Sequence, residues 1–225
     1  MKRLLTTIAK LARDIRHLPN TIRFNFHYFP VRTAMHLPVM VSANVRLVEL
    51  KGNVILKGPV EHRMIRIGFG HVGIFDQKNS RSIWEVSGTV QFDGTAQIGH
   101  GSKICVRGNL RIGTNFTITA ESQIVCFHEI VFGRDCLLSW EILVMDTDFH
   151  KLYNGGGQQI NKNRSIRVGN KNWIGCRALI LKGASTPDNC IIAAGSTVSR
   201  QLLTGDVVLA GSPADVIRTG VTWEK

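Results

Sequence analysis

The sequence predicts an all-β protein built as a solenoid of short strands. Aliphatic side chains recur at six-residue spacing near the C-terminus, at Val168, Ile174, Ile180, Ile192 and Val198. Small side chains occupy the fifth position of the middle repeats, at Ala178, Ala184, Cys190 and Ser196. One aliphatic and one small inward residue per repeat suit a short strand followed by a tight corner. An α-helix is excluded because six steps of about 100° would put these residues on different faces.

Residues 1–50 are predicted to form a short basic helix followed by a capping segment. Six apolar residues share helical spacing and end before Pro19: Leu4, Leu5, Ile8, Leu11, Ile15 and Leu18. Residues 1–67 contain twelve Lys and Arg residues against three Asp and Glu residues. Such a helix suits docking on an anionic membrane surface, shielding of the open solenoid end, or contacts between subunits. The sequence leaves these three roles open.

Residues 51–219 are predicted to form the solenoid, and residues 220–225 a C-terminal tail. Upstream of the regular repeats, the six-residue spacing continues in three registers with slips between them. The inward residues are Phe92, Ile98 and Ile104, then Ile112, Ile118 and Ile124, then Phe132, Leu138 and Val144. A stacked coil tolerates a slip of about two residues where a corner bulges outward.

A polar segment, residues 146–165, interrupts the repeat. It begins with Asp146-Thr147-Asp148-Phe149-His150 and contains three consecutive glycines, residues 155–157, that would suit hinges. Loops of this length inside a compact fold are usually functional or disordered. We therefore expect the interruption to carry the chemistry of the protein.

The composition indicates one domain of a cytoplasmic protein. The 225 residues are 44% apolar, and no Pro-, Gly- or Ser-rich linker divides them. No apolar run approaches the roughly 18 residues that span a bilayer, and the N-terminus lacks a signal-peptide core. Five cysteines without a CxxC pair are expected to be reduced packing residues. No nucleic-acid partner is expected, because no binding motif accompanies the positive charge.

Three blocks of the sequence point to a known family. They are VGNKNWIG at residues 168–175, IAAGSTV at 192–198 and AGSPA at 210–214. With them, residues 86–219 resemble the hexapeptide-repeat acyltransferases. The resemblance implies a left-handed parallel β-helix with three hexads per coil, assembled as a homotrimer with acetyl-CoA in a groove between subunits. The segment at residues 146–150 is most similar to the O-acetyltransferases of capsular, colanic-acid and lipopolysaccharide pathways.

The implied reaction moves an acetyl group from acetyl-CoA to a hydroxyl of a sugar or glycan precursor, without a metal. Histidine suits the general base that such a hydroxyl needs, typically contributing about 10² to 10⁴ in rate. Of the eight histidines, only His150 lies where the repeat stops, and we predict it to be this base. Alternation along an extended chain would put Asp146 and Asp148 on its side. They would then orient the imidazole or bind the acceptor, although capping of the turn fits them as well.

The resemblance also implies residues that bind the cofactor. Trp173 would line the pantetheine groove or pack across a subunit interface. Cys176 and Ala194 match positions whose backbone binds the pantetheine amides. Ser199 and Arg200 stand where the family commonly has Thr-Lys. Arg200 and Arg218 are the candidates for binding the CoA phosphates, although each also fits a solvated surface arginine.

Other functions fit parts of the same pattern. The fold also supports N-acyl transfer to an amino-sugar nucleotide, or a non-catalytic scaffold. A zinc hydratase would need three convergent histidines. His71, His100 and His128 lie near probable corners, but their spacings of 29 and 28 residues do not match whole coils of three hexads. A metal is therefore not expected.

Overall fold

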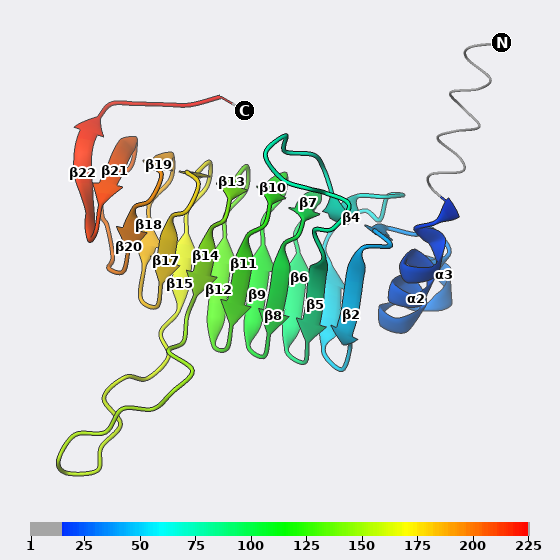
Figure 1. Ribbon diagram of the computed structural model, residues 1–225, viewed down its shortest axis with the longest axis horizontal. Helices are drawn as coiled ribbons and strands as arrows, with labels where there is room; N and C mark the ends of the chain where they lie inside the picture. Colours follow the sequence, from blue (N-terminus) through cyan, green and yellow to red (C-terminus); the bar gives the residue numbers. More distant parts are fainter. Residues whose placement is uncertain (1–14, 225) are drawn as a thin grey trace.

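The chain winds into three sheets around one core. The computed structural model describes residues 15–224, and each of the first six described coils contributes one strand to each sheet (Figure 1). Sheet A consists of β1 (Val39–Val41), β4 (Ile65–Phe69), β7 (Ala96–His100), β10 (Phe116–Ala120), β13 (Leu137–Trp140), β16 (Trp173–Ile174), β19 (Cys190–Ile192), β21 (Val207–Gly211) and β22 (Ala214–Thr219). Sheet B consists of β2 (Val45–Glu49), β5 (Ser82–Val86), β8 (Lys103–Val106), β11 (Gln123–Cys126), β14 (Leu143–Met145), β17 (Leu179–Leu181) and β20 (Thr197–Val198). Sheet C consists of β3 (Asn53–Leu56), β6 (Thr89–Phe92), β9 (Asn109–Ile112), β12 (Glu129–Phe132), β15 (Ile166–Val168) and β18 (Ser185–Thr186).

Neighbouring strands run parallel, as successive coils of a solenoid require. Only the last pair of the described strands, β21 and β22, is antiparallel, and it closes the C-terminal end as a hairpin. The predicted all-β, left-handed parallel β-helix is confirmed.

The register of sheet A shows two coil lengths. Ile98 pairs with Ile118 and Ile118 with Leu138, so a coil takes 20 residues here. Ile174 pairs with Ile192, so a coil takes 18 residues, or three hexads, near the C-terminus. A 20-residue coil is two residues longer than three hexads, which accounts for the slips between the upstream registers.

The two additional residues lie at the corner between sheets B and C, here called the B–C corner. In the longer coils, the inward residues on its two sides are Ile104 and Ile112, eight positions apart. In the shorter coils they are Ile180 and Thr186, six positions apart. The B–C corner therefore bulges outward in the first half of the solenoid.

The core is a set of stacked ladders, one inside each sheet. The ladder of sheet A contains Ile67, Ile98, Ile118, Leu138, Ile174, Ile192 and Leu209, all buried. The five aliphatic residues that define the six-residue repeat are buried as well, as are the four small residues between them. Each buried aliphatic side chain contributes about 1.5–3 kcal/mol relative to exposure. Stacking lets coils that could not bury an apolar face alone form one continuous core.

The N-terminal boundary differs from the prediction. Sheets A and B begin with β1 and β2, so the solenoid starts at Val39 and not at residue 51. The repeat is hard to see there because β1 and β4 align residues 26 positions apart, as in the pair Val39–Ile65. A long segment between β4 and β5, residues 70–81, leaves the repeat and further obscures its period.

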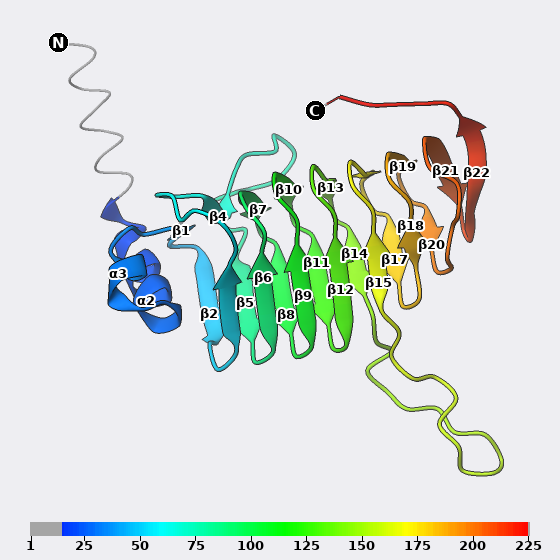
Figure 2. The same cartoon turned by 180° about the vertical axis from the view of Figure 1, so that it is seen from behind.

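Two helices cover the N-terminal end of the solenoid, opposite β22 (Figure 2). They are α2 (Leu18–Tyr28) and α3 (Val31–Ala34). The helix predicted before Pro19 lies almost entirely outside the described residues. The predicted helix ends before Pro19, whereas α2 begins at Leu18 with this proline in its first turn, where proline is tolerated. Neither described helix has the length and apolar character needed to cross a membrane.

Candidate active site

The insertion, residues 146–165, leaves the solenoid at the B–C corner between β14 and β15 (Figure 1). We call it the arm. Its base is closed by a hydrogen bond of 3.3 Å from the Arg164 amide to the Asp146 carbonyl oxygen. The arm therefore enlarges the same corner that is already expanded in the preceding coils.

Asp146 anchors the base of the arm to the coil below. Its side chain is fully buried. The two carboxylate oxygens accept hydrogen bonds from the backbone amides of Phe127, at 2.7 Å, and His128, at 2.8 Å. A carboxylate with both oxygens engaged in this way satisfies two amides of a tight corner. Among the alternatives left open by the sequence, the structure places Asp146 in the capping role and not beside the imidazole of His150.

Phe149 breaks the alternation that was expected along this segment. Its φ is 60°, in the left-handed region that is uncommon for a bulky residue. The Phe149 ring packs edge-on against Phe127, with ring centroids 5.1 Å apart. The expectation that Asp146, Asp148 and His150 share one side is therefore wrong, because the backbone turns between the second aspartate and the histidine.

Asp148 ties the arm to the coil above. Its carboxylate accepts a hydrogen bond of 2.8 Å from Asn161 Nδ2 and forms an ion pair with Lys182. The hydrogen bond from the Lys182 ammonium holds the pKa of the Asp148 carboxyl below its usual range. Asp148 thus joins both sides of the arm to the B–C corner that follows β17.

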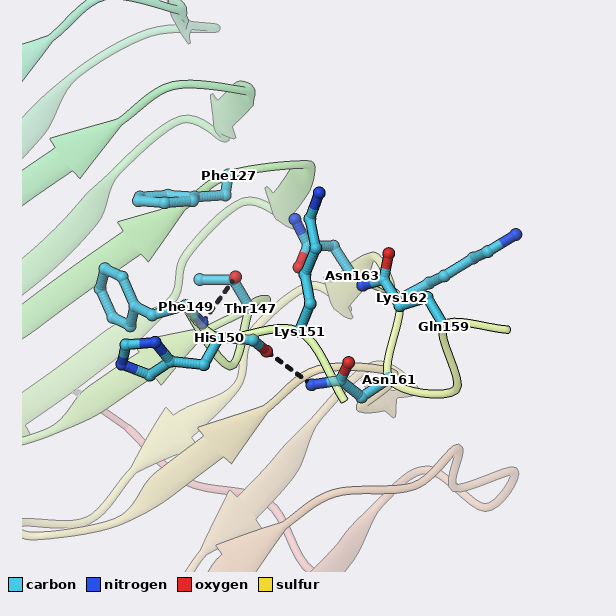
Figure 3. Close-up of a pocket in the computed structure, with 9 residues that line it drawn as sticks. All are labelled: Phe127, Thr147, Phe149, His150, Lys151, Gln159, Asn161, Lys162 and Asn163. Atoms are coloured by element: carbon cyan, nitrogen blue, oxygen red, sulfur yellow. Dashed lines mark hydrogen bonds between the residues drawn. The ribbon is translucent and has the colours of Figure 1, made fainter. Parts of the chain in front are cut away.

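His150 is presented on a fixed backbone with a free side chain. Its amide donates to the Asp148 carbonyl at 2.6 Å, and its carbonyl accepts from Asn161 Nδ2 at 2.8 Å. The residue is exposed, and its imidazole has no hydrogen-bond partner among residues 15–224. Figure 3 shows the ring beside Phe149, on the opposite side of the chain from Asn161. Both ring nitrogens are therefore available to a substrate.

A hollow of about 310 Å³ surrounds this residue. It lies between the corner below and the two sides of the arm. It is lined by Phe127, Thr147, Phe149, His150, Lys151, Gln159, Asn161, Lys162 and Asn163 (Figure 3). Its size is at the lower end of the range for small-ligand pockets, about 300–1,000 Å³. The floor is aromatic and the rim is polar and basic, a combination that suits a sugar.

Beyond His150 the arm is a hairpin that projects from the solenoid (Figure 1). Tyr153 bridges to Gln159, and the Ile160 amide donates to the Leu152 carbonyl at 2.9 Å. The three glycines form the hairpin tip, remote from His150, so they do not act as hinges beside it. Leu152, Tyr153 and Ile160 are all more than half exposed, at 57%, 57% and 62%. These apolar side chains are therefore not covered by the rest of the described chain.

Three of the predicted cofactor residues lie on the outer face of sheet A and on one corner of the solenoid. Trp173 is on the outer face of sheet A, 38% exposed, and donates a hydrogen bond of 3.2 Å from Nε1 to Ser139 Oγ. Cys176 and Ala194 lie on the corner between sheets A and B, the A–B corner, in successive coils. Within the described residues, neither of their backbone amides donates a hydrogen bond. Two free amides one coil apart suit recognition of a chain of amide carbonyls.

The remaining cofactor candidates lie elsewhere. Ser199 and Arg200 follow β20 at the B–C corner, and Arg218 lies on β22. Arg200 forms an ion pair of 3.1 Å with Asp215, which the sequence did not suggest. Arg218 is exposed. Both arginines remain solvent-facing cations near the C-terminal end of the solenoid.

Within one chain, the structure does not bring the predicted base and the predicted cofactor amides together. His150 projects from the B–C corner, whereas Cys176 and Ala194 lie on the A–B corner. The full width of sheet B stands between these two corners. Of the predicted cofactor residues, Ser199 and Arg200 share the corner of His150.

The structure does not bring together the three histidines that a zinc site would require. His71 acts on His100 at the A–B corner, but His128 lies at the B–C corner. His100 is buried beside the Ser80 hydroxyl, 3.0 Å from Nδ1, and its burial lowers the pKa of the imidazole. Residues 15–224 contain no cluster of His, Cys, Asp and Glu side chains that could hold a metal ion. All five cysteines are free thiols.

Three residues at the site were not identified from the sequence. Phe127 supports the Phe149 ring, while Asn161 and Lys182 hold Asp148. Coil stacking offered a signal for Lys182, because it follows β17 at the corner directly above the base of the arm. No sequence pattern indicated that Asn161 folds back to Asp148.

No family model matches the chain, while the curated proteins that its sequence matches include two O-acetyltransferases. Over 113 residues it is 32% identical to the galactoside O-acetyltransferase of Escherichia coli (strain K12), covering 49% of this chain and 54% of that relative. Over 96 residues it is 30% identical to the polysialic acid O-acetyltransferase of Neisseria meningitidis, covering 42% and 45%. The matches thus span about half the length of these relatives.

The fold is similar to that of a solved acetyltransferase. The crystal structure of the polySia specific acetyltransferase NeuO superposes with a TM-score of 0.60, at 21% identity, over 84% of this chain and 79% of that chain. A likeness at this identity establishes the architecture, and the sequence matches supply the relationship. The chain therefore has the fold of a left-handed parallel β-helix, and about half of it is similar to a galactoside O-acetyltransferase and to a polysialic acid O-acetyltransferase.

Proposed function

We propose that this protein is an acetyl-CoA-dependent O-acetyltransferase that acts on a hydroxyl of a sugar or glycan precursor. The observation that carries the proposal is His150, whose unpartnered imidazole is held by its backbone at the mouth of a sugar-sized hollow. The relationship to a galactoside O-acetyltransferase and a polysialic acid O-acetyltransferase supports the reaction class.

In this proposal His150 is the general base. It accepts the hydroxyl proton while the acceptor oxygen attacks the thioester carbonyl carbon, so that attack does not form a free alkoxide. The carbon–sulfur bond then breaks, and the histidine returns the proton to the departing sulfur. Direct transfer needs no nucleophile on the protein. Asn161 and Asp148 serve by fixing the His150 backbone, since they contact its carbonyl and amide.

We further propose that the complete site forms between two copies of the chain in a homotrimer. The free amides of Cys176 and Ala194 would bind the pantetheine of acetyl-CoA, with Trp173 along the groove. Those groups lie a sheet width from His150 in the same chain, which supports donation of His150 by a neighbour. The exposed apolar residues of the arm would be buried in the same contact between subunits.

Release of free CoA, followed with a thiol reagent over a panel of sugars, tests this function. Wild-type protein should release CoA only when an acceptor is present. His150→Ala should lower turnover by about 10² to 10⁴ while acetyl-CoA affinity changes little. The matched control is His71→Ala, since His71 is exposed and far from the arm. Normal turnover in His150→Ala would exclude this residue as the base. Absence of CoA release with every acceptor would favour a scaffold.

A further inference from the structure

The helix α2 caps the N-terminal end of the solenoid, opposite β22 (Figure 2). A usual surface helix buries its apolar stripe. In α2 the buried residues are Thr21, Asn25 and a single apolar residue, Phe24, while its other large apolar side chains face outward.

The inward side of α2 carries polar residues next to Phe24 because it faces the open edge of β1. Thr21 Oγ1 accepts a hydrogen bond from the Val41 amide, at 3.0 Å, and contacts the Val41 carbonyl oxygen at 3.2 Å. Asn25 does the same for Val39, donating to its carbonyl at 2.6 Å and accepting from its amide at 3.2 Å. These side chains take the place of the missing next strand, which protects an edge that would otherwise pair with other chains. The shielding role predicted for the N-terminal region is thus filled by α2.

The outward side has no such task, yet it is apolar. The large apolar side chains of this side, of Ile15 ahead of α2, and of α3 and the residue after it are between 39% and 69% exposed. They are Ile15, Leu18, Ile22, Phe26, Val31 and Met35. Leu18, Ile22 and Phe26 are four residues apart and lie on one face of α2. We call these six residues the cap face.

The segment that forms the cap face carries positive charge only. Residues 15–48 contain four arginines, at positions 16, 23, 32 and 46, and no Asp or Glu. All four arginines are exposed. The nearest acidic residues come from neighbouring segments, since Glu49 acts on Tyr28 and Glu61 precedes His62, which contacts the His36 carbonyl. An apolar stripe on a segment whose charged residues are all arginines matches a surface that is apolar in depth and anionic at its edge.

We propose that the cap face docks on an anionic lipid bilayer, with its apolar side chains entering the headgroup boundary and its arginines meeting lipid phosphates. Two other occupants are disfavoured by charge. A second copy placed on the same face would bring the arginines of both copies together. The preceding segment, residues 1–14, carries four Lys and Arg residues against one Asp, so it is also basic. An anionic bilayer, in contrast, would attract both the cap face and residues 1–14. This inference is independent of the proposed function.

Co-sedimentation of the full chain with vesicles provides the test. Binding should be at least about tenfold stronger to vesicles of phosphatidylcholine with phosphatidylglycerol than to phosphatidylcholine alone, and should weaken with added salt. The double variant Ile22→Gln/Phe26→Gln should lose roughly tenfold in binding, because it removes two apolar side chains that would enter the bilayer and leaves the net charge unchanged. The matched control is Leu203→Gln, an 84% exposed apolar residue near the other end of the solenoid.

Three results would overturn the proposal. The first is no preference for anionic vesicles. The second is unchanged binding by Ile22→Gln/Phe26→Gln together with loss of binding on deletion of residues 2–14, which would assign the contact to that segment. The third is a change of molecular mass in Ile22→Gln/Phe26→Gln without vesicle binding by the wild type, which would assign the cap face to subunit contacts. An unchanged melting temperature shows that the double variant is folded, and acetyl transfer to a soluble acceptor is measured in parallel.

Discussion

Two corners that lie one above the other in this solenoid differ fourfold in length. Val144 pairs with Ile180, and Val168 pairs with Thr186, so both corners join the same two points of the cross-section. The upper corner covers the distance in six residues and the lower one in 24. The core ladders continue through both without a break. Register in the sheets therefore fixes the fold whatever the corner contains, and the lower corner is free to carry an arm with His150.

The largest effect should come from separating the two halves of the proposed site. His150→Ala removes the base, and Ala194→Trp fills the exposed A–B corner where pantetheine would bind. His150→Ala alone should lose about 10² to 10⁴ in turnover, and Ala194→Trp alone should lose activity because acetyl-CoA no longer fits the corner. Unfolding the two together and refolding the mixture should restore activity, because about a quarter of the sites in random trimers would pair an intact histidine with an intact corner.

The control for this mixing experiment is Thr204→Trp, which places the same bulk at another exposed position. It should be active alone. Failure of the mixed variants to regain activity, with trimers formed, would mean that His150 and the A–B corner of the same chain work together, or that one of them has no role.

A smaller effect, on stability, should follow from the ladder that both corners share. Ile180→Ala deletes a fully buried side chain between Val144 and Val198. The free energy of unfolding should fall by about 2–5 kcal/mol. Turnover per folded molecule should remain at the wild-type level, because the arm keeps its anchors. A loss of turnover without a loss of stability would show that the upper corner participates in catalysis directly.

Asp146 lies at the junction of the two regions, and its loss should affect both. Asp146→Ala leaves the buried amides of Phe127 and His128 without acceptors, at a cost of about 1–3 kcal/mol for each unpaired group. Denaturant unfolding measures this term. Turnover should also drop, since the base of the arm loses its anchor. Asp146→Asn retains one acceptor oxygen and should show an intermediate loss. Equal stability of all three proteins would contradict the anchoring role.

The repeat could be predicted because its inward residues recur at a fixed spacing along the chain. Residues such as Ile174 and Ile192 recur at a spacing that only a solenoid explains, and their burial follows from it. The start of the solenoid at Val39 was missed because the first coils are longer than three hexads and their period is obscured. The polar residues on the inward side of α2 were missed for another reason, since a helix that completes a strand edge needs hydrogen-bonding residues there, and Phe24 is its single buried apolar residue.

The site was only partly predictable, because its contacts depend on the particular backbone path of the arm. The position of His150 followed from the break in the period. The role of Asp146 did not, because the left-handed backbone of Phe149 reverses the alternation on which the expectation rested. The partner of Asp148, Lys182, is 34 residues away in sequence and becomes a neighbour only after the arm is set aside and the coils are stacked.

The smallest effect should come from releasing the arm from the corner above. Lys182→Met removes the ammonium that holds the pKa of the Asp148 carboxyl below its ordinary value. Because the folded-state pKa is lowered, the pair contributes at pH values above the ordinary aspartate pKa of about 3.9 and is lost as pH falls through the lower, folded value. Between about pH 5 and 8 the pair is therefore constant, and its removal should change arm protection by the same factor throughout. Limited proteolysis at the hairpin tip measures that protection, and Lys162→Met, which removes a solvent-facing cation of the same arm, is the control. A protection factor in Lys182→Met that varied across this pH range would show that another titrating group holds the arm.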